Sequence, residues 1–280
     1  MKIENKTFDE ERTLYGIHDA EITNCCFKGP ADGESAFKET GCLTVKGCLF
    51  DLRYPFWHTE KSNIHNCEMT VNCRAALWYD KDINISDCVM NGIKALRECC
   101  GISMKNCRII SPEFSWRCRN MRFKDCILES EYPFFECSKM DIVNLKMNGK
   151  YSFQYVEDTV ITNSELNTKD AFWHSRNVTV IDSVLKGEYL GWYSENLHLI
   201  RCRIIGTQPL CYCKGLVLEE CTMEHTDLSF ENSDVNAVII GSIDSVKNPV
   251  SGSITASGID EIIFDSEKAD PENTKIILTS

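Results

Sequence analysis

A column of residues dominated by cysteine recurs along this chain at nearly constant spacing. The first three steps are 23, 19 and 21 residues long, and the following seven are all 19 residues long. A fixed period near 20 residues is the signature of a solenoid, in which each repeat stacks on the next. The column comprises Cys25, Cys48, Cys67, Cys88, Cys107, Cys126, Leu145, Ser164, Ser183, Cys202 and Cys221.

Apolar residues keep the same register around this column. They recur five and three positions before it and two positions after it, and these three columns contain no charged residue. Alternation at two positions indicates a short strand, and the step of three indicates a bend between strands. Asparagine, aspartate or glycine precedes most members of the column, and these types suit tight bends. We therefore predict an all-β fold, a single-stranded parallel β-helix of about twelve rungs of 19 residues.

The repeat accounts for the cysteines in structural terms. A narrow solenoid core favours small apolar side chains, and free cysteine is among the most buried residue types. A vertical file of thiols one rung apart does not converge as zinc ligands do, so we predict no metal site. The 17 cysteines are expected to be reduced thiols rather than disulfides, since the start of the chain shows no export signal.

Composition and charge set expectations about partners and location. The formal net charge is −12, which opposes nucleic acid and anionic membrane surfaces. No stretch of about 18 apolar residues occurs, so we expect no transmembrane helix. We predict a cytoplasmic protein without a cofactor, without nucleic-acid or membrane partners, and with a homodimer contact as one alternative use of its surface.

The repeat also suggests a domain plan. We predict one β-helix domain over residues 1–280, with an N-terminal cap at 1–17 and regular rungs at 18–243. Residues 244–280 are expected to form irregular rungs and a C-terminal cap, because the cysteines stop there. Residues 28–35 account for the long first step and are expected to form a surface loop.

Two adjacent columns at another phase of the repeat are unusual. A phenylalanine and leucine column is followed by a column that holds all five tryptophans together with Arg97 and Gln154. Two registers compete, because either the phenylalanines or the tryptophans point into the core. Burying Arg97 and Gln154 is costly, so we favour inward phenylalanines. In either register, we expect the His, Tyr, Glu and Arg side chains at the next position to be accessible.

Several segments around these columns carry a family resemblance. They are SPEFSWRC (111–118), SEYPFFEC (130–137), GKYSFQY (149–155), TKDAFWH (168–174) and GEYLGWY (187–193). The chain resembles an uncharacterised bacterial family of single-stranded right-handed β-helix proteins within the pectin-lyase-like superfamily. The resemblance implies right-handedness but no activity, because that family has no known function. Polysaccharide lyases and hydrolases in the superfamily are an analogy at the level of fold.

The catalytic signatures of known β-helix pectinases are absent from the sequence. The polygalacturonase set of Asn-Thr-Asp, Asp-Asp, Gly-His-Gly and Arg-Ile-Lys does not occur. No cluster of calcium-binding aspartates opposite a catalytic arginine, as in pectate lyases, is visible either. Pectinase chemistry of those known types is therefore not expected.

A glycosidase-like interpretation of the accessible column remains. Glu98, Arg117 and Glu136 occupy consecutive rungs, which places the two carboxylates about 9–10 Å apart, near the upper limit for inverting glycosidases. In this version Glu98 and Glu136 are the acid/base pair, Arg117 stabilises negative charge, and His174 joins the catalytic set. The alternative is a vertical Glu–Arg–Glu salt-bridge ladder. The candidate substrate-binding residues are Arg97, Trp116, Gln154, Tyr155, Asp170, Trp173, Trp192 and Tyr193.

The functional prediction rests on this aromatic and charged face. Tryptophan and tyrosine suit the apolar faces of sugar rings, while Arg, Glu and His suit hydroxyl or acidic groups. We therefore predict a protein that binds a carbohydrate-like small ligand and that is either an enzyme acting on it or a binding protein. The alternative is a non-catalytic scaffold or protein-interaction module that uses the same face, including for dimerisation.

Overall fold

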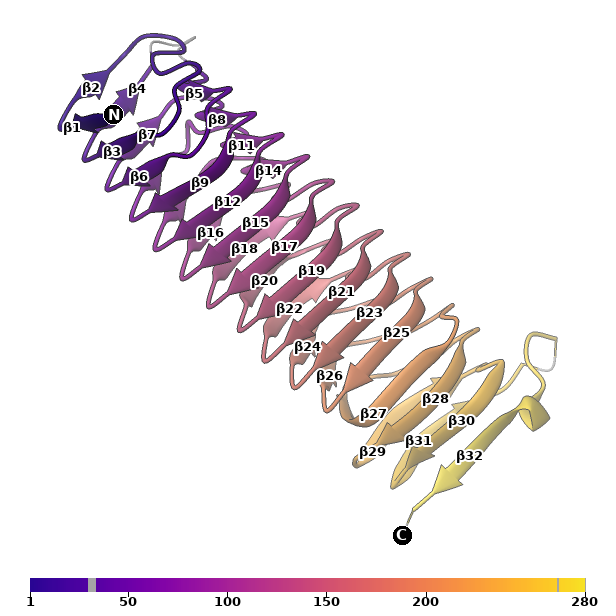
Figure 1. The fold of residues 1–280 in the computed structure, drawn as a ribbon. Helices are drawn as coiled ribbons and strands as arrows, with labels where there is room; N and C mark the ends of the chain where they lie inside the picture. Colours follow the sequence, from indigo (N-terminus) through magenta and orange to yellow (C-terminus); the bar gives the residue numbers. More distant parts are fainter. Residues whose placement is uncertain (30–33, 266, 280) are drawn as a thin grey trace. The chain divides into compact units, whose positions relative to one another are not determined.

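The structure is a computed structural model that describes residues 1–29, 34–265 and 267–279. These residues form an all-β parallel solenoid of about 14 turns, each about 19 residues long (Figure 1). The predicted fold class is confirmed. Contacts within the chain define two units, Met1–Asp141 (unit 1) and Ile142–Ser280 (unit 2). The single domain and its cap boundaries stay predictions, and the loop expected at residues 28–35 lies partly outside the described residues.

The predicted count of about twelve rungs is too low. Strands also pair at the two ends of the sequence, where the cysteine column is missing. β1 (Lys2–Glu4) pairs in parallel with β3 (Glu21–Thr23), and β30 (Ser251–Ala256) pairs with β32 (Thr274–Leu278). Backbone pairing therefore extends beyond the residues whose side chains reveal the repeat.

Unit 1 consists of three parallel ladders, one on each face of the turns (Figure 1). The first ladder contains β1, β3, β6 (Thr44–Lys46), β9 (Glu60–His65), β12 (Lys81–Ser86), β15 (Cys100–Lys105) and β17 (Arg119–Lys124). The second ladder contains β2 (Thr7–Phe8), β4 (Cys26–Lys28), β7 (Leu49–Asp51), β10 (Glu68–Met69), β13 (Val89–Met90), β16 (Arg108–Ile110) and β18 (Ile127–Glu131). The third contains β5 (Phe37–Lys38), β8 (Phe56–Trp57), β11 (Leu77–Trp78) and β14 (Leu96–Arg97).

Unit 2 repeats the first two ladders. Its first ladder contains β21 (Glu157–Thr162), β23 (Arg176–Ile181), β25 (Glu195–Ile200), β27 (Leu216–Glu224), β28 (Asp234–Ile239), β30 and β32. Its second contains β20 (Lys146–Lys150), β22 (Glu165–Lys169), β24 (Val184–Lys186), β26 (Arg203–Ile205) and the second half of β27. The remaining elements are β29 (Ser242–Lys247), which pairs with β31 (Gly258–Ile263), the short 3-10 helix η1 (Pro271–Asn273), and β19 (Ser138–Val143), which crosses the boundary between the units.

The core forms because the turns stack in register. Ile83 of β12 pairs with Ile102 of β15, and Ile85 pairs with Met104, so each inward side chain packs on a like side chain one turn away. Period-2 alternation leaves the intervening residues on the outside. The predicted apolar columns are therefore the core of the solenoid.

The structure settles which of the two competing registers is present. Phe56, Phe134 and Phe172 are at most 1% exposed, so the phenylalanine column points into the core. The five tryptophans are half-buried, and the side chains at the following position are largely exposed or half-buried. The preferred register is confirmed, because an inward tryptophan column would have placed Arg97 and Gln154 in the core.

The cysteine column is buried as predicted, and the thiols do more than fill space. All 17 cysteines are free, and 14 of them are buried. The backbone N–H of Cys48 donates a hydrogen bond to Cys67 Sγ at 3.4 Å. In unit 2 the N–H of Ser164 donates to Ser183 Oγ at 3.0 Å. Cysteine and serine therefore share the column because both are small and both accept a hydrogen bond from the bend of the previous turn.

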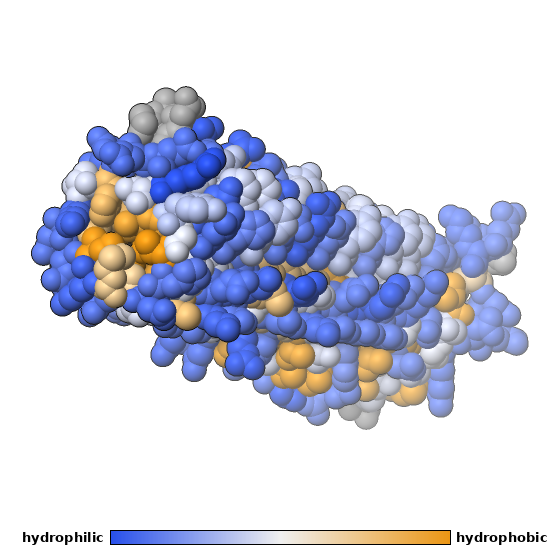
Figure 2. Space-filling view, turned by 45° about the horizontal axis from the view of Figure 1, so that its top comes forward, coloured by the Kyte–Doolittle hydropathy of each residue, from blue (hydrophilic) through white to orange (hydrophobic). Residues whose placement is uncertain are grey.

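The outer surface is mainly polar. Figure 2 shows hydrophilic side chains over most of the face in view, with hydrophobic side chains gathered in separate spots. Within the described part of the chain, no helix is both long enough and apolar enough to span a lipid bilayer.

Candidate functional site

The predicted site residues follow one corner of the turns. The chain passes from the inward phenylalanine column to the half-buried tryptophan column and then to a residue with a left-handed backbone. This conformation costs a non-glycine residue about 1 kcal/mol. Successive turns of the solenoid nevertheless adopt it with different residue types, so the bend of the backbone at this corner does not depend on the side chain. The φ angles are 55° at Glu98, 54° at Arg117, 54° at Glu136, 56° at Tyr155, 53° at His174 and 59° at Tyr193.

In unit 1 this corner carries the charged column, defined as Glu98, Arg117 and Glu136. Arg117 Nε lies 2.7 Å from Glu136 Oε2, and Arg117 Nη1 lies 3.6 Å from Glu98 Oε1. The hydrogen bond that Arg117 donates to Glu136 is the main reason why the pKa of Arg117 is raised. The structure therefore brings the three predicted residues together as a vertical ladder of ion pairs.

This geometry bears directly on the acid/base prediction. A glycosidase needs one carboxylic acid that keeps its proton until it protonates the leaving group. Glu98 and Glu136 instead both hold ion-pair contacts to the same guanidinium, that of Arg117. The contacts therefore fit the salt-bridge alternative better than an acid/base pair.

Trp116 and Arg97 also lie in unit 1, and they pack on each other. The Arg97 guanidinium carbon is 5.0 Å from the centroid of the Trp116 ring, and Arg97 Nη1 is 3.6 Å from Glu113 Oε2. Phe135, one turn further on, lies 5.1 Å from Trp116 between ring centroids. Arg97 and Phe135 come from the turns on either side of Trp116, so both faces of the indole are occupied by the protein itself.

In unit 2 the same corner carries the aromatic column, defined as Tyr155, His174, Tyr193 and Tyr212. Consecutive ring centroids are 5.0, 5.0 and 4.8 Å apart, and the ring planes are within 16° of parallel. Tyr155 is 48% exposed and Tyr193 is 43% exposed. The rings therefore cover one another's faces, while Tyr155, His174 and Tyr193 remain exposed to solvent and Tyr212 is half-buried.

The tryptophan column of unit 2 fastens one turn to the next. Trp173 Nε1 donates to the carbonyl oxygen of Tyr189 at 2.9 Å, and Trp192 Nε1 donates to that of Gln208 at 2.8 Å. Gln154 Nε2 makes the corresponding bond, 3.5 Å long, to Asp170. Each acceptor is 16 residues further along the chain, as Tyr132 is for Trp116. A side-chain N–H donor at this position explains why glutamine and tryptophan share one column.

Further contacts tie the predicted residues Trp173, Trp192 and Asp170 to the protein itself. The rings of Trp173 and Trp192 are stacked, with centroids 5.7 Å apart. The Asp170 carboxyl is largely buried, and this burial raises its pKa, although Lys169 Nζ lies 3.8 Å away. The tryptophan faces predicted to stack on sugars are thus partly taken by each other.

Sequence reasoning missed some members of these arrangements. Tyr212 extends the aromatic column but was not among the predicted site residues, although the 19-residue step from Tyr193 identifies its place. His58 and Tyr79 of unit 1 form a similar pair, with centroids 5.1 Å apart. In the described residues, no group of three or more His, Cys, Asp or Glu side chains lies close enough together to hold a metal ion.

The fold and this corner define a class of protein: a parallel β-solenoid that displays ordered columns of charged and aromatic side chains. The chain belongs to the DUF3737 family, described as a protein of unknown function, whose model matches residues 1–277. The predicted membership of an uncharacterised family is confirmed, while its bacterial origin stays a prediction. No curated protein matches the chain.

Several solved structures share the fold at very low sequence identity. A tailspike protein of E. coli bacteriophage HK620, in complex with a pentasaccharide, is 8% identical with a TM-score of 0.49, over 99% of this chain and 69% of that chain. In another structure of that tailspike this chain spans 62% of its length. The catalytic domain of a GH87 alpha-1,3-glucanase is 10% identical, with a TM-score of 0.38 over 100% and 64% of the two chains. The Azotobacter vinelandii mannuronan C-5 epimerase AlgE4 A-module is 10% identical, with a TM-score of 0.29 over 99% and 87%.

Proposed function

We propose that this protein binds a linear carbohydrate along the corner of unit 2 and catalyses no reaction on it. The observation that carries this proposal is the aromatic column. Tyr155, His174, Tyr193 and Tyr212 place one ring on each of four successive turns. Because stacking occupies the ring faces between neighbouring turns, a ligand would meet His174, Tyr193 and Tyr212 at their ring edges, which carry the imidazole nitrogens and the phenol hydroxyls.

The period of the column favours a carbohydrate. Its rings recur every 4.8 to 5.0 Å, which is the spacing of hydrogen-bonded strands. A linear glycan repeats its hydroxyl groups over a similar length, one sugar unit at a time. An extended peptide presents a side chain to one face only every ~6.7 Å, and the net charge of −12 opposes nucleic acid. Hydroxyl and imidazole groups both donate and accept hydrogen bonds, as sugar hydroxyls do.

The other predicted site residues support the corner without reacting. Trp173, Trp192 and Gln154 fix the turns on which the aromatic column stands. Glu98 and Glu136 each contact Arg117 and have no acid/base role in this function. His174 forms hydrogen bonds to the ligand and does not react. Binding without turnover is therefore the function that these contacts favour.

The test is an oligosaccharide array on the wild-type chain, followed by calorimetric titration of each hit. Tyr193→Phe removes one hydroxyl and keeps the stacked ring, so we expect affinity to fall about fivefold, the worth of one hydrogen bond. Tyr79→Phe is the matched control, because Tyr79 is a stacked ring in the same column of unit 1, 39% exposed. Tyr79→Phe and Glu136→Gln are expected to leave the affinity unchanged.

Three results would count against the proposal. They are an array without hits, equal affinity of wild type and Tyr193→Phe, and turnover of a bound oligosaccharide that Glu136→Gln abolishes. An array without hits, combined with a homodimer that Tyr193→Glu dissociates in sedimentation, would instead favour the interaction-module alternative.

A further inference from the structure

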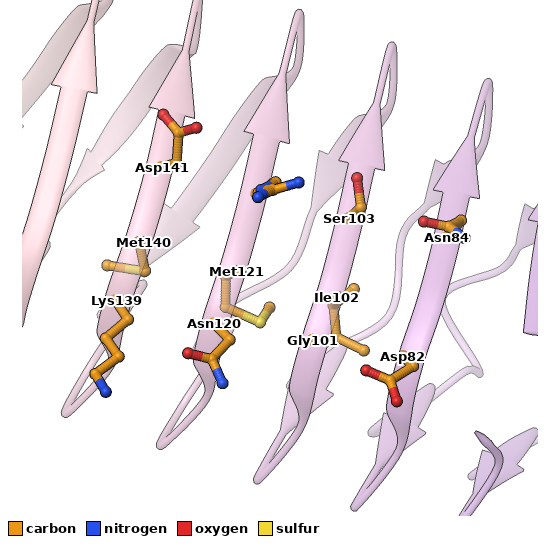
Figure 3. A pocket seen from close by; sticks show the side chains of 11 residues that line it. Asp82, Asn84, Gly101, Ile102, Ser103, Asn120, Met121, Lys139, Met140 and Asp141 are labelled. Atoms are coloured by element: carbon orange, nitrogen blue, oxygen red, sulfur yellow. The ribbon is translucent and has the colours of Figure 1, made fainter. Parts of the chain in front are cut away.

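A polar hollow lies on the outer face of the first ladder in unit 1, on the strands that directly follow the corner described above. Its volume is about 510 Å³, and strands β12, β15, β17 and β19 form its floor. Figure 3 shows Asp82 and Asn84 on one side and Lys139 and Asp141 on the other, with Ser103 and Asn120 between them. Its volume falls in the range of small-molecule sites, about 300–1,000 Å³.

The hollow exists because β15 carries small residues at two outward positions. Gly101 lies next to Asp82, between the register pairs Lys81–Cys100 and Ile83–Ile102. Ser103 pairs with Asn84 and Arg122. Gly101 has a φ of +73°, and a Cβ at this position would lie 2.5 Å from Asp82 Oδ1. Glycine therefore leaves room for the Asp82 carboxylate to reach over β15, and this place, called the notch below, lies between two rows of polar groups.

The charged groups around the notch are free to meet a ligand. On other parts of the outer faces, several charges pair across turns, as Lys81 does with Glu60 at 3.2 Å and Arg201 with Asp182 at 2.6 Å. At the hollow, Asp82, Arg122, Lys139 and Asp141 form no ion pair with any residue that the structure describes. Asn84 Nδ2 is bound to Asn63, which leaves its carbonyl oxygen as an acceptor.

We infer that this hollow binds a neutral, polyhydroxylated ligand of the saccharide class. Two carboxylates and two cations sum to zero, so the site selects neither an anion nor a cation. Lys139 and Asp141 stand on the same strand, so donors and acceptors alternate and are not separated into a basic end and an acidic end. Neighbouring sugar hydroxyls each donate and accept, which matches this alternation. The site is independent of the aromatic column.

The sharpest variant fills the notch without disturbing the backbone. Asparagine tolerates the left-handed conformation, and the same outward position in unit 2 already holds Asn177 and Asn196, whose amides bond across turns at 3.0 Å. Gly101→Asn is therefore expected to fold and to occupy the hollow. Gly215→Asn is the matched control, because Gly215 stands at the same position of the turn with a φ of +61° and next to Asn196.

The measurement is the backbone amide spectrum of the ¹⁵N-labelled full chain, titrated separately with maltotriose, cellotriose, triglycine and inorganic phosphate. We expect at least one trisaccharide to shift the Gly101 and Ser103 amides saturably. Gly101→Asn should raise the dissociation constant of that trisaccharide at least about tenfold. Gly215→Asn and Tyr193→Phe should leave the dissociation constant unchanged. Ser103→Gln, which fills the hollow from an ordinary strand position, should weaken it as well and serves if Gly101→Asn unfolds.

Three outcomes overturn the inference. They are the absence of a saturable shift with both trisaccharides, an unchanged affinity in the filled variants, and a stronger response to triglycine or phosphate than to either sugar. Because the readout is local to Gly101 and Ser103, a failure here is distinguishable from a failure of the aromatic column to bind glycans.

Discussion

The charged column of unit 1 and the aromatic column of unit 2 stand on the same backbone. Arg117 and His174 both follow a half-buried tryptophan, and their φ angles are 54° and 53°. In unit 1 the side chains form ion pairs across turns, since Arg117 contacts Glu98 and Glu136. In unit 2 the aromatic side chains stack, so their ring faces contact each other while the polar ring edges of His174 and Tyr193 stay exposed. The corner fixes where a side chain stands, and the chemistry of its neighbours one turn away decides what remains available to a ligand.

The largest expected contrast between the units is in thiol reactivity. The cysteines that are not buried, Cys26, Cys42 and Cys100, all lie in unit 1, whereas all four cysteines of unit 2 are buried. Burial raises the pKa of Cys211 to about 12 and that of Cys213 to about 11. A buried thiol must wait for local opening, so we expect it to react at least about a hundredfold more slowly than Cys42.

The measurement is iodoacetamide labelling of the native chain, read by peptide mass spectrometry over time. Labelling of the chain in denaturant is the control for the intrinsic reactivity of each thiol. Native labelling of Cys202 or Cys221 as fast as that of Cys42 would remove the contrast.

A second contrast between the units concerns one core position, which Asp80 occupies in unit 1. Its side chain is fully buried, Oδ1 accepts the Thr59 N–H at 2.7 Å, and Oδ2 has no hydrogen-bond partner within the described ranges. The corresponding positions of unit 2 include Ser175 and Ser194. Since an unsatisfied buried polar group costs about 1–3 kcal/mol, Asp80→Cys should raise the free energy of unfolding by about that amount at pH 8.

The pH dependence follows from the direction of the shift. Burial raises the pKa of Asp80 well above its ordinary value. The folded chain then holds this proton more tightly than the unfolded chain, so the free energy of unfolding falls as pH rises from about 4 through the raised pKa. Urea unfolding of the wild type and Asp80→Cys between pH 4 and 9 checks this. The difference between them should grow with pH, and a constant difference would contradict the assignment.

The smallest expected effect is a difference between the charged and aromatic columns in how salt changes the free energy of unfolding of their variants. Glu136→Gln breaks an exposed ion pair and should lower the free energy of unfolding by about 0.5 kcal/mol in dilute buffer. At 1 M NaCl, screening over about 3 Å should remove most of this difference. Tyr193→Phe keeps its ring stack, so its unfolding free energy should show the same small change at both salt concentrations. A salt-independent loss in Glu136→Gln would mean that its role is packing rather than charge.

Much of the fold was predictable because a repeated column averages out the ambiguity of any one turn. Cys107 alone is an uninformative residue, but its recurrence with Cys88 and Cys126 at 19-residue steps identifies a solenoid. The choice of an inward Phe172 over an inward Trp173 followed from the cost of burying Gln154 in the same column. The count of turns was underestimated, because strands such as β1 and β32 pair through backbone groups that leave no side-chain signature.

The candidate site was less predictable, because its chemistry depends on which groups satisfy one another. The sequence placed Trp116 in a column of potential sugar-stacking residues, but Arg97 and Phe135 cover its faces. It did not reveal that Trp173 Nε1 donates to the carbonyl of a residue 16 positions later. The hollow at Gly101 was also missed, since a single glycine in a strand pattern is just as typical of a bulge or a tight bend.

Taken alone, the sequence determined the class of fold, the inward columns and the corner on which the unusual side chains stand. These features follow from the 19-residue spacing and from the alternation of apolar and polar residues, and both can be read along the chain. Cytoplasmic location and the absence of nucleic-acid partners stay predictions from composition. Only the tertiary structure decided which donors, carboxylates and ring faces satisfy each other and which remain open. That division depends on which side chains of neighbouring turns reach one another, and these contacts are set by the way the turns stack.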